Sequence, residues 1–180
     1  YTFTMPGESV TIKAVYQNRF YDLTVDGKTE SREYGSLVNV TAPEKEGYTF
    51  AGWTVKGAQV DNPYNQTLLF RMPAGDVTLT PNYTANKYSL TVDDTMEFKD
   101  YGEPVTVTAA EKEGYTFTDW AVDGVTVADK TSKTLAFTMP AGDVTLTANY
   151  AINHYTLTVN GKAEPKEYGE YVYAYAEDRT

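Results

Sequence analysis

The sequence predicts a mainly β protein made of tandem copies of one small module, and three observations carry this prediction. First, the nine residues Met72–Thr80 recur letter for letter at 139–147, and a looser version occupies 5–13. Second, the chain is rich in strand-forming residues, with 16 Tyr and many Thr and Val. Third, no stretch carries the three-and-four spacing of apolar residues that is typical of an amphipathic helix.

The period of the repeat is 67 residues, and no insertion or deletion is needed to keep it. Tyr34, Tyr101 and Tyr168 obey this spacing, as do Trp53 and Trp120. We therefore divide the chain into the C-terminal part of a preceding repeat (1–16), two full β repeats (17–83 and 84–150, the first and second copy) and the N-terminal part of a following repeat (151–180). A circularly shifted boundary fits the arithmetic equally well.

The first two strands of the second copy are expected over 88–94 and then through Met96 and Phe98. In 88–94, apolar and polar residues alternate, which indicates a half-buried strand. The dipeptides at the equivalent turn, Asp26-Gly27 and Asn160-Gly161, are strong short hairpin signals.

The middle of the copy is expected to contain a strand over 104–109, a polar loop over 111–114 and a longer strand over 115–122. In the longer strand, Phe117 and Trp120 fall on opposite faces of a regular strand. A β-bulge between them would bring both to the core. Asp123-Gly124 then predicts a further hairpin turn.

The last two strands are expected over 134–139 and 143–150, separated by a proline-containing turn. This makes about seven short strands in each copy. The predicted structural core of the repeats consists of Trp53, Trp120, Phe70, Phe137, Met72, Met139, Tyr83 and Tyr150. The junctions between copies are short and contain neither Gly nor Pro, so we expect an elongated array of modules rather than freely swinging beads.

The combined motif of Tyr101-Gly102, Glu113–Phe117 with Trp120, and Phe137–Tyr150 resembles the internalin B-repeat, also called the Listeria–Bacteroides repeat. The first copy carries the same motif. The resemblance implies a β-grasp-like fold; a small β-sandwich is the alternative. Asp119 stands where the family usually has Gly before the tryptophan, so the chain is similar to the divergent branch. The family has no shared catalytic residues.

Composition excludes several kinds of function. The net charge of −10 disfavours binding to nucleic acid. The absence of cysteine excludes disulfides and thiolate chemistry, and no apolar run is long enough for membrane insertion. The single histidine, His154, has no partners in the sequence pattern for acid–base or metal chemistry. We therefore expect no catalytic, cofactor-binding or metal-binding residues and no cofactor.

One feature near the C-terminus does not repeat. Tyr171, Tyr173 and Tyr175 alternate as one face of a strand would, at positions that face outward in the other copies. An exposed aromatic patch of this kind marks a contact site, so these residues are the candidate binding patch. The alternative is that they pack against a neighbouring part of the protein.

The expected function follows from the repeat and from the resemblance. We expect a non-catalytic tandem repeat region of a bacterial secreted or cell-surface protein, which acts as a spacer or stalk and takes part in adhesion or protein contact. The alternatives are a module that binds a glycan or a host protein, and an accessory region of a large secreted enzyme. Expected partners are host or cell-surface proteins, glycans, and other repeats, including packing between chain ends.

Overall fold

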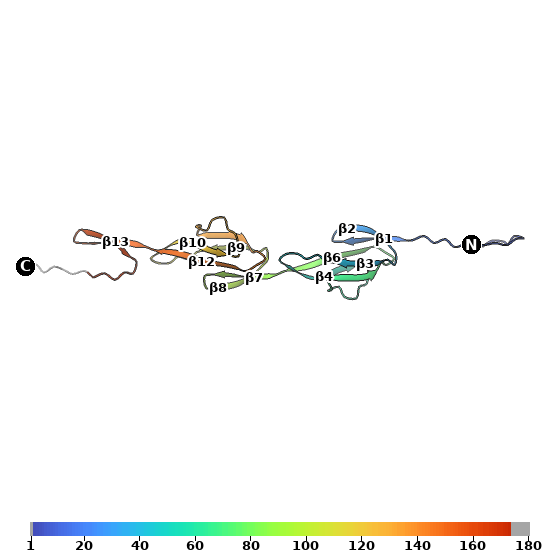
Figure 1. Cartoon of the computed structure of the whole chain (residues 1–180), viewed down its shortest axis with the longest axis horizontal. Helices are drawn as coiled ribbons and strands as arrows, with labels where there is room; N and C mark the ends of the chain where they lie inside the picture. The colour runs from blue at the N-terminus through green and yellow to red at the C-terminus, as the bar shows by residue number, and fades with distance from the viewer. Residues whose placement is uncertain (1, 174–180) are drawn as a thin grey trace, which may run out of the picture. The chain divides into compact units, whose positions relative to one another are not determined.

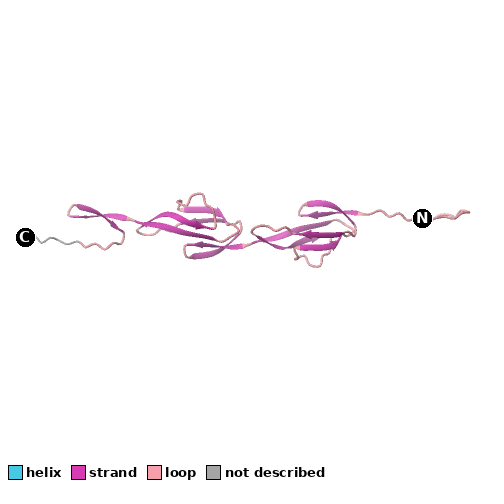
Figure 2. Cartoon of the chain, in the orientation of Figure 1, coloured by secondary structure: helices cyan, strands magenta, loops and turns pink. Residues whose placement is uncertain are grey.

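A computed structural model describes residues 2–173, and the regular structure within that range consists of strands alone (Figure 2). The chain divides into two compact units. Unit 1 runs over Tyr1–Glu44 and Phe50–Tyr83, and unit 2 over Lys45–Thr49 and Thr84–Thr180. The turn at Lys45–Thr49 thus belongs to the first copy by sequence and to unit 2 by contacts.

The strands of the first copy are β1 (Phe20–Val25), β2 (Lys28–Glu33), β3 (Leu37–Thr41), β4 (Tyr48–Lys56), β5 (Thr67–Arg71) and β6 (Val77–Ala85). Those of the second copy are β7 (Lys87–Val92), β8 (Thr95–Asp100), β9 (Pro104–Thr108), β10 (Tyr115–Asp123), β11 (Thr134–Thr138) and β12 (Val144–Ile152). A final hairpin consists of β13 (His154–Val159) and β14 (Lys162–Glu167), as Figure 1 shows.

Each copy contains a four-stranded mixed sheet and a separate two-stranded sheet. The orders are β2-β1-β6-β4 with β3-β5, and β8-β7-β12-β10 with β9-β11. The first strand of each copy pairs in parallel with the last, with Leu23 opposite Val77 and Leu90 opposite Val144. This mixed sheet occurs twice with the same topology, so the predicted class of mainly β tandem modules is confirmed.

The core of each copy lies between its two sheets, because residues from both contribute to one apolar cluster. The buried residues of the first copy are Leu23, Val38, Ala42, Trp53, Leu68, Phe70, Met72, Val77 and Leu79. Those of the second are Leu90, Val105, Ala109, Trp120, Leu135, Met139, Val144 and Leu146. Burial of each large apolar side chain contributes about 1.5–3 kcal/mol.

The local turn chemistry agrees with the sequence. Asp26 and Gly27 have φ of 48° and 77°, and Asn160 and Gly161 have 49° and 76°, as the hairpin turns β1–β2 and β13–β14 require. The predicted bulge is also present: the pairing of β10 with β12 shifts between Phe117 and Asp119. The bulge lets both Phe117 and Trp120 contact the core.

Two expectations about the strands are wrong. Each copy has six strands in the described part of the chain, not seven, and Asp123-Gly124 does not close a hairpin. Strand β10 pairs with β12, and the next strand, β11, pairs with β9. The physical reason for Gly124 is a close approach of two backbones: a Cβ there would lie 2.0 Å from the carbonyl oxygen of Asp143.

Candidate functional site

A tight turn at Lys112–Tyr115 is the first part of the candidate site. The N–H of Tyr115 donates to the carbonyl of Lys112 at 3.0 Å. Gly114, at the third position, has a φ of 77°, which is the left-handed backbone of a type II turn. The Lys112 ammonium lies 4.3 Å from the centre of the Tyr115 ring. This cation–π contact orders the turn.

The turn binds the chain segment that leads into strand β13. The N–H of Asn153 donates to the carbonyl of Gly114 at 2.8 Å. The hydroxyl of Thr116 donates to Oδ1 of Asn153 at 2.6 Å. In turn, the carbonyl of Asn153 accepts from the N–H of Tyr168 at 2.9 Å. The turn of the second copy is therefore linked by hydrogen bonds to the partial copy that follows it.

The ring of Tyr168 completes this arrangement by lying against the glycine. A Cβ added at Gly114 would lie 1.9 Å from Cδ1 of Tyr168, so the ring occupies the space that any other residue would need. The rings of Tyr115 and Tyr168 meet edge to face, with centroids 6.3 Å apart. We call these contacts among Gly114, Tyr115, Thr116, Asn153 and Tyr168 the turn–tyrosine joint.

The same joint occurs a second time in unit 2, one period of 67 residues earlier. The N–H of Asn86 donates to the carbonyl of Gly47 at 2.8 Å, and the Thr49 hydroxyl donates to Oδ1 of Asn86 at 2.6 Å. The rings of Tyr48 and Tyr101 meet edge to face at 5.4 Å. Two independent occurrences make the joint a property of the repeat.

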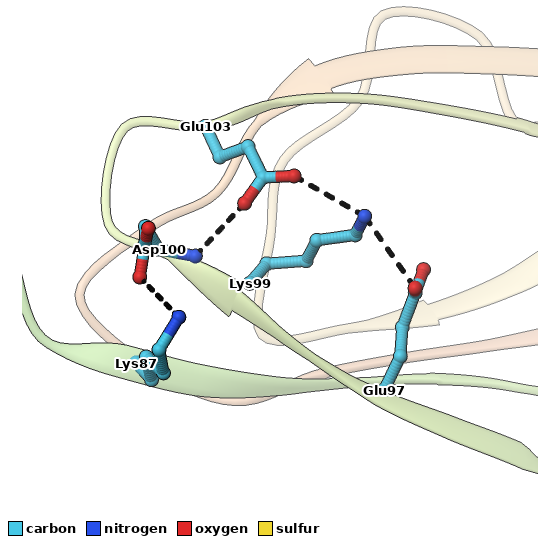
Figure 3. A network of polar contacts seen from close by, with 5 residues as sticks. All are labelled: Lys87, Glu97, Lys99, Asp100 and Glu103. Atoms are coloured by element: carbon cyan, nitrogen blue, oxygen red, sulfur yellow. Dashed lines mark hydrogen bonds and ion pairs between the residues drawn. The ribbon is translucent and has the colours of Figure 1, made fainter.

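A network of charged residues holds the turn that carries Tyr101 (Figure 3). Lys99 lies between Glu97 and Glu103, at 3.4 Å and 3.2 Å, and a second carboxylate oxygen of Glu103 accepts from the N–H of Asp100 at 3.0 Å. Lys87 pairs with the Asp100 carboxylate at 2.7 Å. The hydrogen bond from Asp100 lowers the pKa of Glu103, and the hydrogen bond to Glu103 raises the pKa of Lys99.

The turn that carries Tyr168 has the equivalent network. Lys166 pairs with Glu164 and Glu170, and Glu170 accepts from the N–H of Glu167 at 3.1 Å. The hydrogen bond with Lys166 lowers the pKa of Glu170. The nearby carboxylate of Glu113 raises the pKa of the Tyr168 hydroxyl, because it disfavours a second negative charge.

The structure places the predicted core residues as follows. Trp53, Trp120, Met72, Met139 and Phe70 are buried, and Phe137 is half-buried against the same cluster. Tyr83 and Tyr150 are half-buried, and their hydroxyls donate to the carbonyls of Pro43 and Ala110 at 2.6 Å and 2.7 Å.

The candidate binding patch is only partly described. Tyr171 and Tyr173 are 89% and 80% exposed and lie outside regular strand structure, whereas Tyr175 lies outside the described residues.

The acidic residues after the proline turns have internal partners: Asp76 accepts from the N–H of Asp22 at 2.9 Å, and Asp143 from that of Ser89 at 2.8 Å. This bond lowers the pKa of Asp143.

Residues 2–173 contain neither a cluster suited to hold a metal ion nor a helix suited to cross a membrane. No group of three or more histidine and acidic side chains in this range is arranged to hold a metal ion. No helix in the same range is long and apolar enough to cross a membrane.

Sequence reasoning missed the turn–tyrosine joint, although its signal is present. Both Glu-Gly-Tyr and Tyr-Gly recur at the period. The local pattern only places Glu113-Gly114 in a polar loop and Tyr115 at the start of the strand that follows. A recurrent Gly beside a recurrent Tyr, with Asn86 and Asn153 also one period apart, indicates a shared contact. The pattern alone does not reveal that the partner lies in the following copy.

Comparison with known proteins agrees with the presence of two tandem copies of one repeat. The family model of the divergent InlB B-repeat domain matches twice, at 23–87 and 89–154. Internalin H of Listeria monocytogenes (serovar 1/2a) is 39% identical over 142 residues, which cover 72% of this chain and 24% of that protein. A putative Gly-rich membrane protein of Evansella cellulosilytica is 29% identical over 190 residues, which cover 92% of this chain and 21% of that protein. The chain spans about a quarter or less of these relatives. No solved structure matches it.

Proposed function

Because the chain belongs to the divergent InlB B-repeat family, we propose that it is a non-catalytic repeat region of a bacterial secreted or cell-surface protein, and that it acts as a spacer. The repeats hold other parts of the protein at a distance from its anchor. We also propose the module boundaries 17–83 and 84–150. The names of the relatives, an internalin and a membrane protein, support this placement.

The observation that carries the spacer proposal is the turn–tyrosine joint. A spacer must resist folding back on itself, and a junction that is held by hydrogen bonds and an aromatic contact resists better than a loose linker. The joint at Gly114 supplies the Asn153 and Thr116 hydrogen bonds and the Tyr168 ring in one place. The joint thus gives the proposed spacer a physical means of keeping its length.

Small-angle X-ray scattering of the full chain tests the spacer proposal. A spacer predicts an elongated monomer whose maximum dimension is unchanged by protein concentration. Replacing both joint glycines, as Gly47→Val with Gly114→Val, should broaden the distance distribution, whereas Gly142→Val is the control because a Cβ there meets no atom within 4 Å. A compact particle for the unmodified chain would refute the proposal.

A second candidate function is binding of a host protein or glycan through the candidate binding patch. It is favoured by the exposure of Tyr171 and Tyr173, since exposed tyrosines are enriched in contact sites. A glycan array and a host-protein screen with the full chain test it. Loss of any captured ligand on replacement of Tyr171, Tyr173 and Tyr175 by Thr is the expected result. Unchanged affinity would exclude the patch.

A further inference from the structure

The first copy carries the tyrosine half of a joint, and no turn among residues 2–173 lies against it. Tyr34 stands one period before Tyr101. Its N–H donates to the carbonyl of Arg19 at 2.8 Å, as the N–H groups of Tyr101 and Tyr168 donate to Asn86 and Asn153. Tyr34 is nevertheless 58% exposed, against 38% for Tyr168. The backbone is set as in the occupied joints, but the ring is uncovered.

A hollow lies beside this ring. It has a volume of about 420 Å³, and its lining includes Asn18, Arg19, Tyr21 and Tyr34. Tyr21 is the counterpart of Tyr155, whose ring lies 6.4 Å from that of Tyr168 in the occupied joint. Two of its lining residues, Arg19 and Tyr34, are thus the counterparts of residues that contact the turn in the occupied joints. The rest of the lining is Gln17, Asn18, Tyr21, Glu33 and Ala74.

We propose that the surface formed by Arg19, Tyr21 and Tyr34 is a docking site for the Lys-Glu-Gly-Tyr turn of another copy of this repeat. The turn at Gly47 and the turn at Gly114 already occupy the equivalent surfaces around Tyr101 and Tyr168. The occupant is thus identified by two observed examples. The inference holds whether or not the protein is a spacer at a cell surface.

The one substitution in the site is compatible with this occupant. Arg19 stands where the other joints have Asn, which accepts from the Thr hydroxyl of the turn. A hydroxyl both donates and accepts, so the same Thr can accept from the Arg19 guanidinium. The turn also carries a glutamate, Glu46 or Glu113, whose charge is complementary to that of arginine.

The test provides Tyr34 with a turn in the same chain. Residues 84–134 are fused before Tyr1, so that they complete a copy with residues 1–16 and leave the full chain intact. Hydroxyl-radical labelling read by mass spectrometry then measures the modification of each tyrosine. We expect Tyr34 to be labelled several-fold more slowly than in the unfused chain, and Tyr168, which the added segment does not duplicate, to be unchanged. An unchanged rate for Tyr34 would overturn the proposal.

Two variants make the result specific. Gly114→Val in the added copy alone should restore the labelling of Tyr34, because its Cβ would clash with the ring; if Tyr34 stays protected, the turn is not the occupant. A second fusion, in which residues 84–150 replace 1–16, guards against misfolding of the composite copy. The added copy brings a third tryptophan, so an emission maximum as blue-shifted as that of the unfused chain, in which both tryptophans are buried, shows that the added copy is folded. Full labelling of Tyr34 beside a folded added copy rejects the site.

Discussion

At the scale of single residues, the joint depends on what glycine lacks. Gly114 needs a positive φ, which other residues adopt at a cost of about 1–2 kcal/mol. The position also requires a residue without a Cβ, because the Tyr168 ring occupies the space where a Cβ would be. Gly102 has a similar φ but no neighbour within 4 Å of its missing Cβ. The two glycines look alike in the sequence and differ only in what surrounds them.

The Tyr168 hydroxyl provides a probe of the intact joint. The carboxylate of Glu113 raises its pKa above 10.0. Ionisation of Tyr168 therefore costs more in the folded chain than in the unfolded chain, so the folded state loses stability as the pH rises through the raised pKa. We expect Glu113→Gln to lower the pKa of Tyr168 in a titration followed by NMR of labelled tyrosine. Glu111→Gln, which removes the same charge two residues away, should leave that pKa unchanged.

Trp53 and Trp120 stand one period apart, but their indole nitrogens differ in hydrogen bonding. The indole N–H of Trp53 donates to the carbonyl of Gln66 at 3.3 Å, whereas Nε1 of Trp120 is buried without a partner. Replacing Trp53 by phenylalanine removes a hydrogen bond that contributes about 0.5–1.5 kcal/mol to stability, whereas replacing Trp120 removes no such bond. Chemical denaturation should therefore show that Trp53→Phe destabilises its copy more than Trp120→Phe. The opposite order would contradict the assigned geometry.

At the scale of the strands, much was predictable from local pattern. Alternation located the strands, and the opposite parity of Phe117 and Trp120 located the bulge. The pairing of β9 with β11 and the absence of a hairpin at Gly124 were not predictable, because they depend on contacts between segments far apart in the chain. Gly124 resembles a turn glycine, yet it is required by the approach of the Asp143 backbone.

Two alanine substitutions separate these roles of glycine in the second copy. Gly102→Ala adds only backbone strain, so we expect it to cost about 1–2 kcal/mol of unfolding free energy. Gly124→Ala adds a clash with the Asp143 carbonyl, which cannot move without disturbing strand β12. Urea denaturation should show a clearly larger loss for Gly124→Ala. Equal losses would mean that the backbone approach at Gly124 is unimportant.

At the scale of the molecule, repetition turns one local contact into a property of the array. The two core clusters contain no residue from β13 or β14. An isolated two-stranded hairpin is at best marginally stable in water. The joint is therefore the contact expected to keep this hairpin ordered. Repeat period and family were visible in the sequence, whereas this coupling was not, because it depends on where the Tyr168 ring lies.

Hydrogen exchange of the β13–β14 amides tests the coupling most directly. The full chain is compared with Gly114→Val and with the control Gly142→Val. We predict that Gly114→Val speeds exchange at Tyr155 and Leu157 at least tenfold, while the core amides of Leu90 and Leu146 stay as protected as in the control. Equal exchange of the hairpin amides in both variants would contradict the claim that the turn–tyrosine joint couples one copy to the next.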